Sequence, residues 1–209
     1  MTQPGPGRLY GGRSAIDRRA ERRSRLLAAG MQMFGTVGYA MAPVGAICKT
    51  ANLSTRQYYE EFASREALLI AVYDDVNRGA LQAVAEALAE LDTPALGERI
   101  RTALETYVAH TASDLRCARV MYVEIVGVNQ AIEAYRMDWR RRWVTLIGGM
   151  LQEAIDTGQI PCRDYRLAAG AFIGAVDGLL QDWCAAEDRA PLPDVIAELC
   201  RIAAAATAQ

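Results

Sequence analysis

Histidine and lysine are almost absent from this chain of 209 residues, which has one of each, His110 and Lys49, beside 22 arginines. A single histidine excludes a metal site built from several imidazoles. The five cysteines are widely spaced and form no C-x-x-C pair, which argues against a zinc ribbon, a thioredoxin motif or a dense disulfide framework. They are Cys48, Cys117, Cys162, Cys184 and Cys200. The sequence therefore predicts no metal and no cofactor, and free thiols typical of the cytoplasm.

Long hydrophobic runs are also missing. The longest weakly polar run, Leu167 to Leu180, has 14 residues and contains Asp177, so it is too short and too polar to span a bilayer. The N-terminal arginines are followed by no apolar stretch, unlike those of a secretory signal. With 52% hydrophobic and 23% charged residues, the composition is that of a globular protein of one or two domains.

The net charge of −2 hides an uneven distribution. Residues 1–65 hold nine arginines and one lysine against four acidic residues, a balance of +6. The remainder holds 13 basic and 21 acidic residues, a balance of −8. A basic front on an acidic body indicates that the front meets a polyanion. The arginines between positions 18 and 25 form either a solvated helix face or an arm lying over that polyanion.

The pattern of the chain predicts an all-α protein of about nine helices. Residues 1–12, rich in proline and glycine, are predicted to be a disordered tail. A first helix runs from Ser14 to about Thr36, and breaks follow at Asp92 to Pro94, 113–114, 127–129, 158–161 and 191–193. Pro94 is expected at the first position of the helix after the first of these breaks.

Residues 43–62 have the spacing of a helix-turn-helix. A short helix begins near Pro43, and Asn52 can take the left-handed conformation that a tight turn needs. Ser54 and Gln57 form a capping-box pattern that starts a second helix from Thr55 to about Phe62. The pattern alone is weak, since many helical hairpins share it.

The start of this second helix carries residue types that contact DNA. Arginine can bind guanine with two hydrogen bonds and glutamine can do the same with adenine, while threonine and tyrosine contact methyl groups or phosphates. Tyr58 and Tyr59 can instead be half-buried packing residues. Ser64 then caps a longer helix, and Arg65 in its first turn suits a phosphate.

The apolar and signature positions over about 47 residues, from Leu26-Leu27 through Gly38-Tyr39 and Tyr58-Tyr59 to Leu68-Leu69, resemble the TetR family of transcriptional regulators. The resemblance implies a homodimer in which an N-terminal three-helix DNA-binding domain enters the major groove. A C-terminal helical domain would bind a small effector and dimerise. The expected domains are residues 13–63 and 64–209.

By this resemblance Tyr59 matches a phosphate-binding tyrosine, and Thr55 to Tyr58 match the variable base-reading positions. The sequence departs from the family at Asn52, where glycine is usual, and at Glu61, which is often histidine. Glu60 and Glu61 are expected to face away from phosphate. The predicted DNA-binding residues are Lys49, Ser54, Thr55, Arg56, Gln57, Tyr58, Tyr59 and Arg65.

Small residues recur every fourth position in the helix from about Asp164 to Glu187, and the last helix has an apolar stripe. Such features suit either tight packing within one chain or a four-helix dimer interface, which we favour. The predicted interface residues are Gly170, Gly174, Gly178, Val195, Ile196, Leu199 and Ile202.

The effector pocket is predicted from residue type alone. An apolar pocket with a few polar groups is the usual architecture, although each candidate can equally be ordinary packing. The candidates are Tyr107, His110, Met121, Glu124, Trp139, Trp143, Phe172 and Trp183. The run Arg140-Arg141-Arg142 is either a solvated face or a site for an anionic ligand such as an acyl-CoA phosphate.

The sequence thus predicts a cytoplasmic, sequence-specific transcriptional regulator that binds a palindromic operator. It would be a repressor released by a small hydrophobic or amphipathic effector. Two alternatives stay open at this point: a helical enzyme using the C-terminal cavity, with His110 and Glu124 as an acid–base pair, and a helical adaptor that binds protein.

Overall fold

The computed structural model describes residues 15–92 and 95–208, and these contain nine α-helices, one π-helical turn and no strand. The elements in chain order are α1 (Ala15–Val37), α2 (Val44–Ala51), α3 (Thr55–Glu61), α4 (Arg65–Ala89), α5 (Leu96–Ala112), α6 (Leu115–Arg119), the π-helical turn η1 (Val120–Glu124), α7 (Gln130–Asp156), α8 (Arg166–Ala185) and α9 (Leu192–Thr207). This confirms the all-α prediction.

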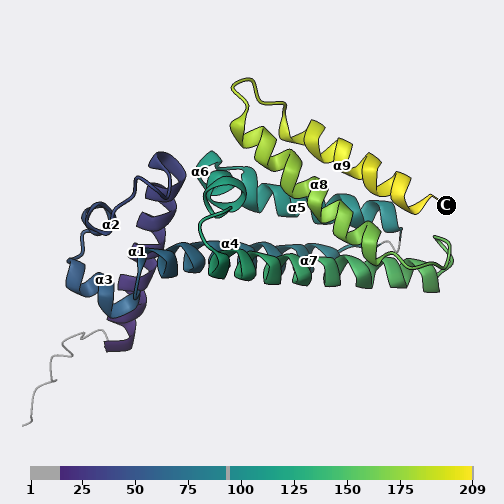
Figure 1. Ribbon diagram of the computed structural model, residues 1–209. Helices are drawn as coiled ribbons and strands as arrows, with labels where there is room; N and C mark the ends of the chain where they lie inside the picture. Colours follow the sequence, from purple (N-terminus) through teal and green to yellow (C-terminus); the bar gives the residue numbers. More distant parts are fainter. Residues whose placement is uncertain (1–14, 93–94, 209) are drawn as a thin grey trace, which may run out of the picture.

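Two parts of different shape are joined end to end (Figure 1). The helices α1, α2 and α3 gather at one end of the molecule, and α4 and α7 run lengthwise away from them. Helix α5 packs against α4 and α8 against α7, and α9 covers α5 and α8. We term the first part, with the start of α4, the helix-turn-helix domain, and the second part the cavity domain.

The helix-turn-helix domain is folded around fully buried apolar side chains from each of its helices. Leu26 and Phe34 of α1, Ile47 of α2 and Leu68 of α4 all have no exposed surface. Each of these helices thus turns an apolar face to the core, and burial of a side chain of this size stabilises the fold by about 1.5–3 kcal/mol.

The turn between α2 and α3 is built as the sequence predicts. Asn52 adopts a left-handed conformation, with φ of 51°, and its N–H donates to the carbonyl oxygens of Cys48 and Lys49. Ser54 and Gln57 form the reciprocal capping box at the start of α3. Both ends of the turn are thereby satisfied by local hydrogen bonds, which fixes the angle between the two helices.

The two domains meet where α1 ends. A Cβ atom on Gly35 of α1 would lie 2.5 Å from the backbone of Arg116, so α1 and α6 touch at a glycine. Glu124, in η1, accepts a hydrogen bond of 2.8 Å from the Tyr39 N–H and pairs with Arg119 at 3.0 Å. The turn η1 was not predicted, because nothing in the local sequence pattern distinguishes a π-helical turn from an α-helix.

Several expected boundaries shift when they are compared with the structure. α5 begins at Leu96 with Ala95 as its N-cap, whereas its predicted start at Pro94 lies outside the described residues. The predicted tail, residues 1–12, also lies outside them. α8 begins at Arg166, slightly later than expected. Among the described residues no helix is long and apolar enough to cross a membrane.

Candidate DNA interface and effector cavity

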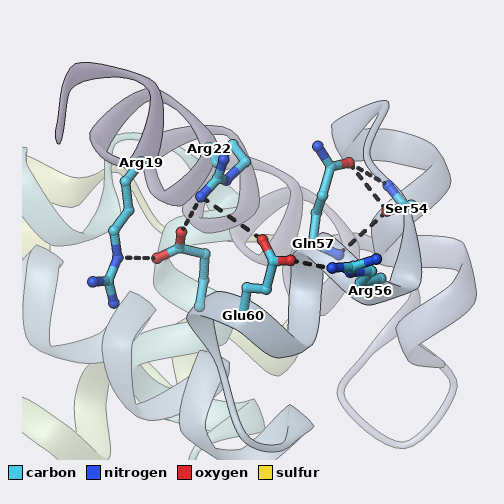
Figure 2. Close-up of polar contacts among 7 residues, drawn as sticks. Arg19, Arg22, Ser54, Arg56, Gln57 and Glu60 are labelled. Atoms are coloured by element: carbon cyan, nitrogen blue, oxygen red, sulfur yellow. Dashed lines mark hydrogen bonds and ion pairs between the residues drawn. The ribbon is translucent and has the colours of Figure 1, made fainter. Parts of the chain in front are cut away.

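One face of α3 is exposed and polar. Thr55, Arg56, Tyr59 and Glu60 are all exposed, and their spacing places them side by side on the helix. Figure 2 shows Arg56 and Glu60 beside each other, with Ser54 and Gln57 at the start of the helix. Lys49 is exposed in the last turn of α2. This face is the part of the helix-turn-helix motif that a groove of DNA can reach.

Tyr58 was predicted to contact bases, and the structure corrects this. Its side chain has no exposed surface, its ring packs against Phe62, and its hydroxyl donates to the Ser64 carbonyl at 3.0 Å. Burial raises the pKa of this phenol well above its usual value. Tyr58 therefore belongs to the core, in which α3 packs on α1 and α2. Its neighbour Tyr59 is 55% exposed and remains a candidate phosphate contact.

Gln57 is present at the predicted position, but its carbonyl is engaged. Its Oε1 accepts a hydrogen bond of 2.9 Å from the Ser54 N–H, while the Ser54 Oγ accepts from the Gln57 N–H at 3.2 Å. A bidentate contact with adenine needs both the oxygen and the nitrogen of the amide. While the capping box holds, Gln57 can offer DNA its amide nitrogen alone.

Arg56 is the one cationic residue of α3, and 89% of its side chain is exposed. Its Nε lies 3.3 Å from Glu60 Oε1, one helical turn along. This pair uses Nε, so the two terminal nitrogens of the guanidinium group can still bind the N7 and O6 atoms of a guanine.

The arginines of α1 hold the domain together. Arg19 and Arg22 bind the carboxylate of Glu61 at 3.1 and 3.2 Å, and only 1% of that side chain is exposed. Arg25 donates to the carbonyl oxygens of Ala51 and Asn52, at the end of α2. Arg22 and Arg25 are thus only partly exposed and engaged within the domain, whereas 67% of the Arg19 side chain remains exposed, as on a solvated face. As expected, the Glu61 carboxylate is turned inward. Glu60, for which the same was expected, is instead exposed beside Arg56 on the polar face of α3.

Arg65 also makes intramolecular contacts. Its guanidinium group lies 4.2 Å from the centre of the Tyr39 ring and donates to the carbonyl oxygens of Ala40 and Ala42 at 3.3 and 3.4 Å. The side chain thus ties the start of α4 to the segment between α1 and α2. Contact of Arg65 with phosphate stays a prediction.

A large cavity lies between α4, α5, α7, α8 and the end of α9. Water-sized molecules can occupy about 100 Å³ of it, and the wider void of about 1040 Å³ includes open solvent. The wall is mostly apolar, and of the predicted pocket residues Tyr107, Trp143 and Phe172 line it. Whether they contact an effector stays a prediction.

Five predicted pocket residues are not among those that line the cavity. Met121 is buried in η1, Trp139 donates to Asp74 at 3.2 Å, and Trp183 donates to the Ala190 carbonyl at 2.8 Å. His110 is exposed on α5 and covers Gly79 of α4.

Glu124 is the fifth, and it lies at the domain junction described above rather than in the cavity. Its carboxylate is engaged by Tyr39 and Arg119. His110 and Glu124 therefore do not form the acid–base pair that the enzyme alternative required.

The cavity has a polar end that the sequence did not reveal. Asp177 Oδ2 lies 3.1 Å from Arg140 Nη1 and 3.6 Å from Arg136 Nη1, so two guanidinium groups share one carboxylate oxygen. Burial raises the pKa of Asp177, and the two arginines oppose that shift. Of the run 140–142, Arg140 lines the cavity, whereas Arg141 and Arg142 are exposed and pair with Asp138.

The predicted dimer residues differ in exposure. On α9, Ile196 and Leu199 are buried in the core of their own chain, so these two predictions are wrong as partner contacts, whereas Val195 and Ile202 are half-buried and stay predictions. On α8 a Cβ at Gly174 would lie 3.3 Å from Arg140 Nη2, and the Gly170 carbonyl accepts a hydrogen bond from the same nitrogen. Gly178 is exposed, with nothing within 4 Å of its Cβ position.

Comparison with known proteins decides the family. A model described as the tetracyclin repressor-like C-terminal domain matches residues 93–204, and a model of the bacterial regulatory proteins of the tetR family matches residues 26–72. The chain belongs to the TetR family. This TetR-family chain is a DNA-binding transcriptional regulator, and its relatives are regulators rather than enzymes. Regulators of this family bind operator DNA as homodimers and respond to small molecules.

Relatives of this TetR-family regulator include proteins of fatty acid metabolism. The fatty acid metabolism regulator protein of Bacillus subtilis (strain 168) is 22% identical over 160 residues, 76% of this chain and 81% of the relative. The fatty acid degradation regulator FadR of Bacillus halodurans has a TM-score of 0.80 at 18% identity, over 87% of this chain and 94% of the other. FadR of Bacillus subtilis in complex with stearoyl-CoA has a TM-score of 0.78 at 20% identity, over 88% and 97%. At these identities the structural likeness establishes the shared fold.

Proposed function

We propose that this regulator is a cytoplasmic repressor whose α3 reads a palindromic operator and whose cavity binds a releasing effector. The contacts with DNA would come from the exposed face of the motif, with Thr55 and Arg56 on bases and Lys49 and Tyr59 on phosphates. The observation that supports this most directly is the exposed Arg56 on a rigidly capped α3. Ser54 and Gln57 would act mainly by fixing the start of that helix.

We propose further that the effector is an amphipathic molecule with a long apolar chain and an anionic group. The cavity wall extends along α7 from Arg136 to Leu151, and at 1.5 Å per residue this is about 22 Å. Arg136 and Arg140 place guanidinium groups at the polar end, where both pair with Asp177 and Arg136 also pairs with Glu133. A carboxylate or phosphate there would replace Asp177 as their partner, while the apolar wall takes the chain. The stearoyl-CoA in complex with the B. subtilis relative has this chemistry.

The dimer would form through the exposed side of α8. Leu167 is 89% exposed, and Ala171 and Gly178 follow on the same helix. Small side chains allow a second helix to approach closely, and a large exposed leucine supports an apolar contact. Replacement of Gly178 by arginine is therefore expected to give monomers in light scattering, while Leu199, buried in its own chain, would affect folding instead.

The test begins with selection of DNA bound by the purified protein from a random pool. A repressor of this kind enriches a short palindrome and loses affinity steeply as salt rises, because binding releases counterions. Absence of any enriched sequence, from folded and dimeric protein, would overturn the proposal.

The effector is then tested on the enriched operator with a long-chain fatty acid, its CoA thioester and its methyl ester. We expect one of the two anionic probes, and not the ester, to release the protein. Arg140→Ala should weaken that response by tenfold or more, on the order of a charged hydrogen bond. Arg141→Ala is the matched control, since Arg141 is exposed next to Arg140 in the chain. Equal responses to the ester and the anions would exclude the anionic subsite.

A further inference from the structure

Glu60 places a carboxylate on the face of α3 that is turned toward DNA. It is exposed, as are Thr55, Arg56 and Tyr59, whereas the neighbouring Glu61 is buried against α1. A negative charge on this face weakens binding to every phosphate backbone, so it lowers affinity for DNA in general. The Glu60 carboxylate causes no loss of affinity only where a hydrogen-bond donor on the DNA binds it.

The geometry around Glu60 limits what it can do. Its Oε1 accepts from Arg56 Nε at 3.3 Å, and its Oε2 lies 3.9 Å from Arg22 Nη2, so it is held between α1 and the start of α3 (Figure 2). Arg22 is already bound to Glu61 at 3.2 Å. Two arginines thus orient the carboxylate, while 45% of its side chain remains exposed. An exposed acceptor that its neighbours already orient loses less entropy on binding than a free one.

In the major groove cytosine N4 and adenine N6 are both amine donors, but adenine also presents the N7 acceptor beside its amine, so cytosine is the base that pairs best with a carboxylate. Thymine presents an acceptor instead. Four residues along an α-helix span about 6 Å, roughly the rise of two base pairs. A guanine bound by Arg56 and a cytosine bound by Glu60 would thus lie about two base pairs apart.

From this geometry we propose that Glu60 is a specificity-determining residue, which accepts a hydrogen bond from one cytosine of each operator half-site. Its bond to Arg56 Nε also orients the guanidinium group, so that its terminal nitrogens face the groove. Glu60 lowers affinity for DNA that lacks the cytosine, because its charge repels the phosphates there. It thereby increases the difference in affinity between the operator and unrelated DNA. The proposal rests on α3 being the helix that reads the operator.

The experiment uses the full-length protein and the operator that it selects. Each cytosine of the half-site is replaced in turn by pyrimidin-2-one, which lacks the N4 amine and keeps the ring. The wild type should lose roughly tenfold or more in affinity at one cytosine, the range of a single base contact. Glu60→Ala should lose less than threefold at that cytosine, and should bind unrelated DNA more tightly than the wild type.

A matched variant separates recognition from charge. Glu86→Gln removes one exposed carboxylate from α4, where Glu86 accepts from Gln82, and should behave as the wild type at every cytosine. If Glu60→Ala and the wild type respond equally to amine removal at every cytosine, the proposal is wrong. Circular dichroism and elution as a dimer establish that each variant folds. Failure to select any operator would instead overturn the proposed function, so the two failures are distinct.

Discussion

The helix-turn-helix domain and the cavity domain use charged side chains in opposite ways. In the first, arginines lie near the surface and tie neighbouring helices together, as Arg25 does at the end of α2. In the second, Arg136, Arg140 and Asp177 gather at one end of an apolar cavity. The first arrangement gives a rigid surface of fixed shape. The second places paired charged groups inside the cavity, where a ligand can exchange one partner for another.

The largest expected effect is on the core of the helix-turn-helix domain. Tyr58→Ala removes a fully buried aromatic side chain, which costs about 3–5 kcal/mol of folding free energy. Phe172→Ala, in a wall that already borders empty space, should cost clearly less and should change effector binding. Denaturant unfolding followed by circular dichroism measures both. Equal losses would show that the cavity is collapsed in solution.

A smaller effect separates two kinds of contact within the exposed face of α3. Arg56→Ala should lose about 1–3 kcal/mol at particular base pairs and relax preference there, because arginine reads base edges. Tyr59→Phe should weaken binding to all sequences alike, because its hydroxyl meets phosphate. Titration of operator variants distinguishes them, and parallel losses on every sequence would contradict the assignment.

The two domains should also respond to acid with opposite sign. The hydrogen bond from the Tyr39 hydroxyl lowers the pKa of Glu66 below 4.5, so its stabilisation is present above that pH and is lost as the pH falls. Burial raises the pKa of Asp177 above 3.8, so its ionisation costs stability at neutral pH, and this cost disappears as the pH falls through the raised pKa.

The measurement is the unfolding free energy of the wild type against Glu66→Gln and Asp177→Asn, between about pH 3 and pH 7. As the pH falls, the advantage of the wild type over Glu66→Gln should shrink, while the wild type should gain relative to Asp177→Asn. The same sign for both variants would contradict the contrast between the domains.

The smallest effect is expected at Arg141, whose pair with Asp138 is exposed. Arg141→Ala should change the unfolding free energy by less than about 0.5 kcal/mol, as surface ion pairs do. Arg140→Ala is measured in the same unfolding series. If both variants lose a comparable unfolding free energy, the greater exposure of Arg141 does not make its ion pair less important to stability.

Local patterns predicted the fold of the helix-turn-helix domain well. Asn52, Ser54 and Gln57 act through neighbours within a few residues, so their roles can be inferred from the sequence itself. The apolar and polar faces of a seven-residue helix are harder to separate. Tyr58 and Tyr59 are adjacent in sequence, and tertiary packing alone decides which one is buried.

The cavity was predicted in kind but not in detail. Tyr107, Trp143 and Phe172 were identified by residue type, whereas Arg136 and Asp177 meet across two helices and have no local signal. The inward face of α9 was misjudged for a related reason. An apolar stripe such as that of Ile196 and Leu199 shows that a face is buried, but not whether its own chain or a partner covers it.

The π-helical turn η1 sets the direction of one side chain at the domain junction. α6 runs directly into η1, and Glu124 at its end reaches the Tyr39 N–H. Each residue of an α-helix advances the side-chain direction by about 100°, and a π-helical turn accommodates one residue more than an α-turn. Removal of one residue from this turn would therefore rotate Glu124 away from Tyr39 by about 100°. The extra residue of this turn therefore sets the direction in which the Glu124 side chain leaves the helix, and this direction lets it reach the chain at the end of α1.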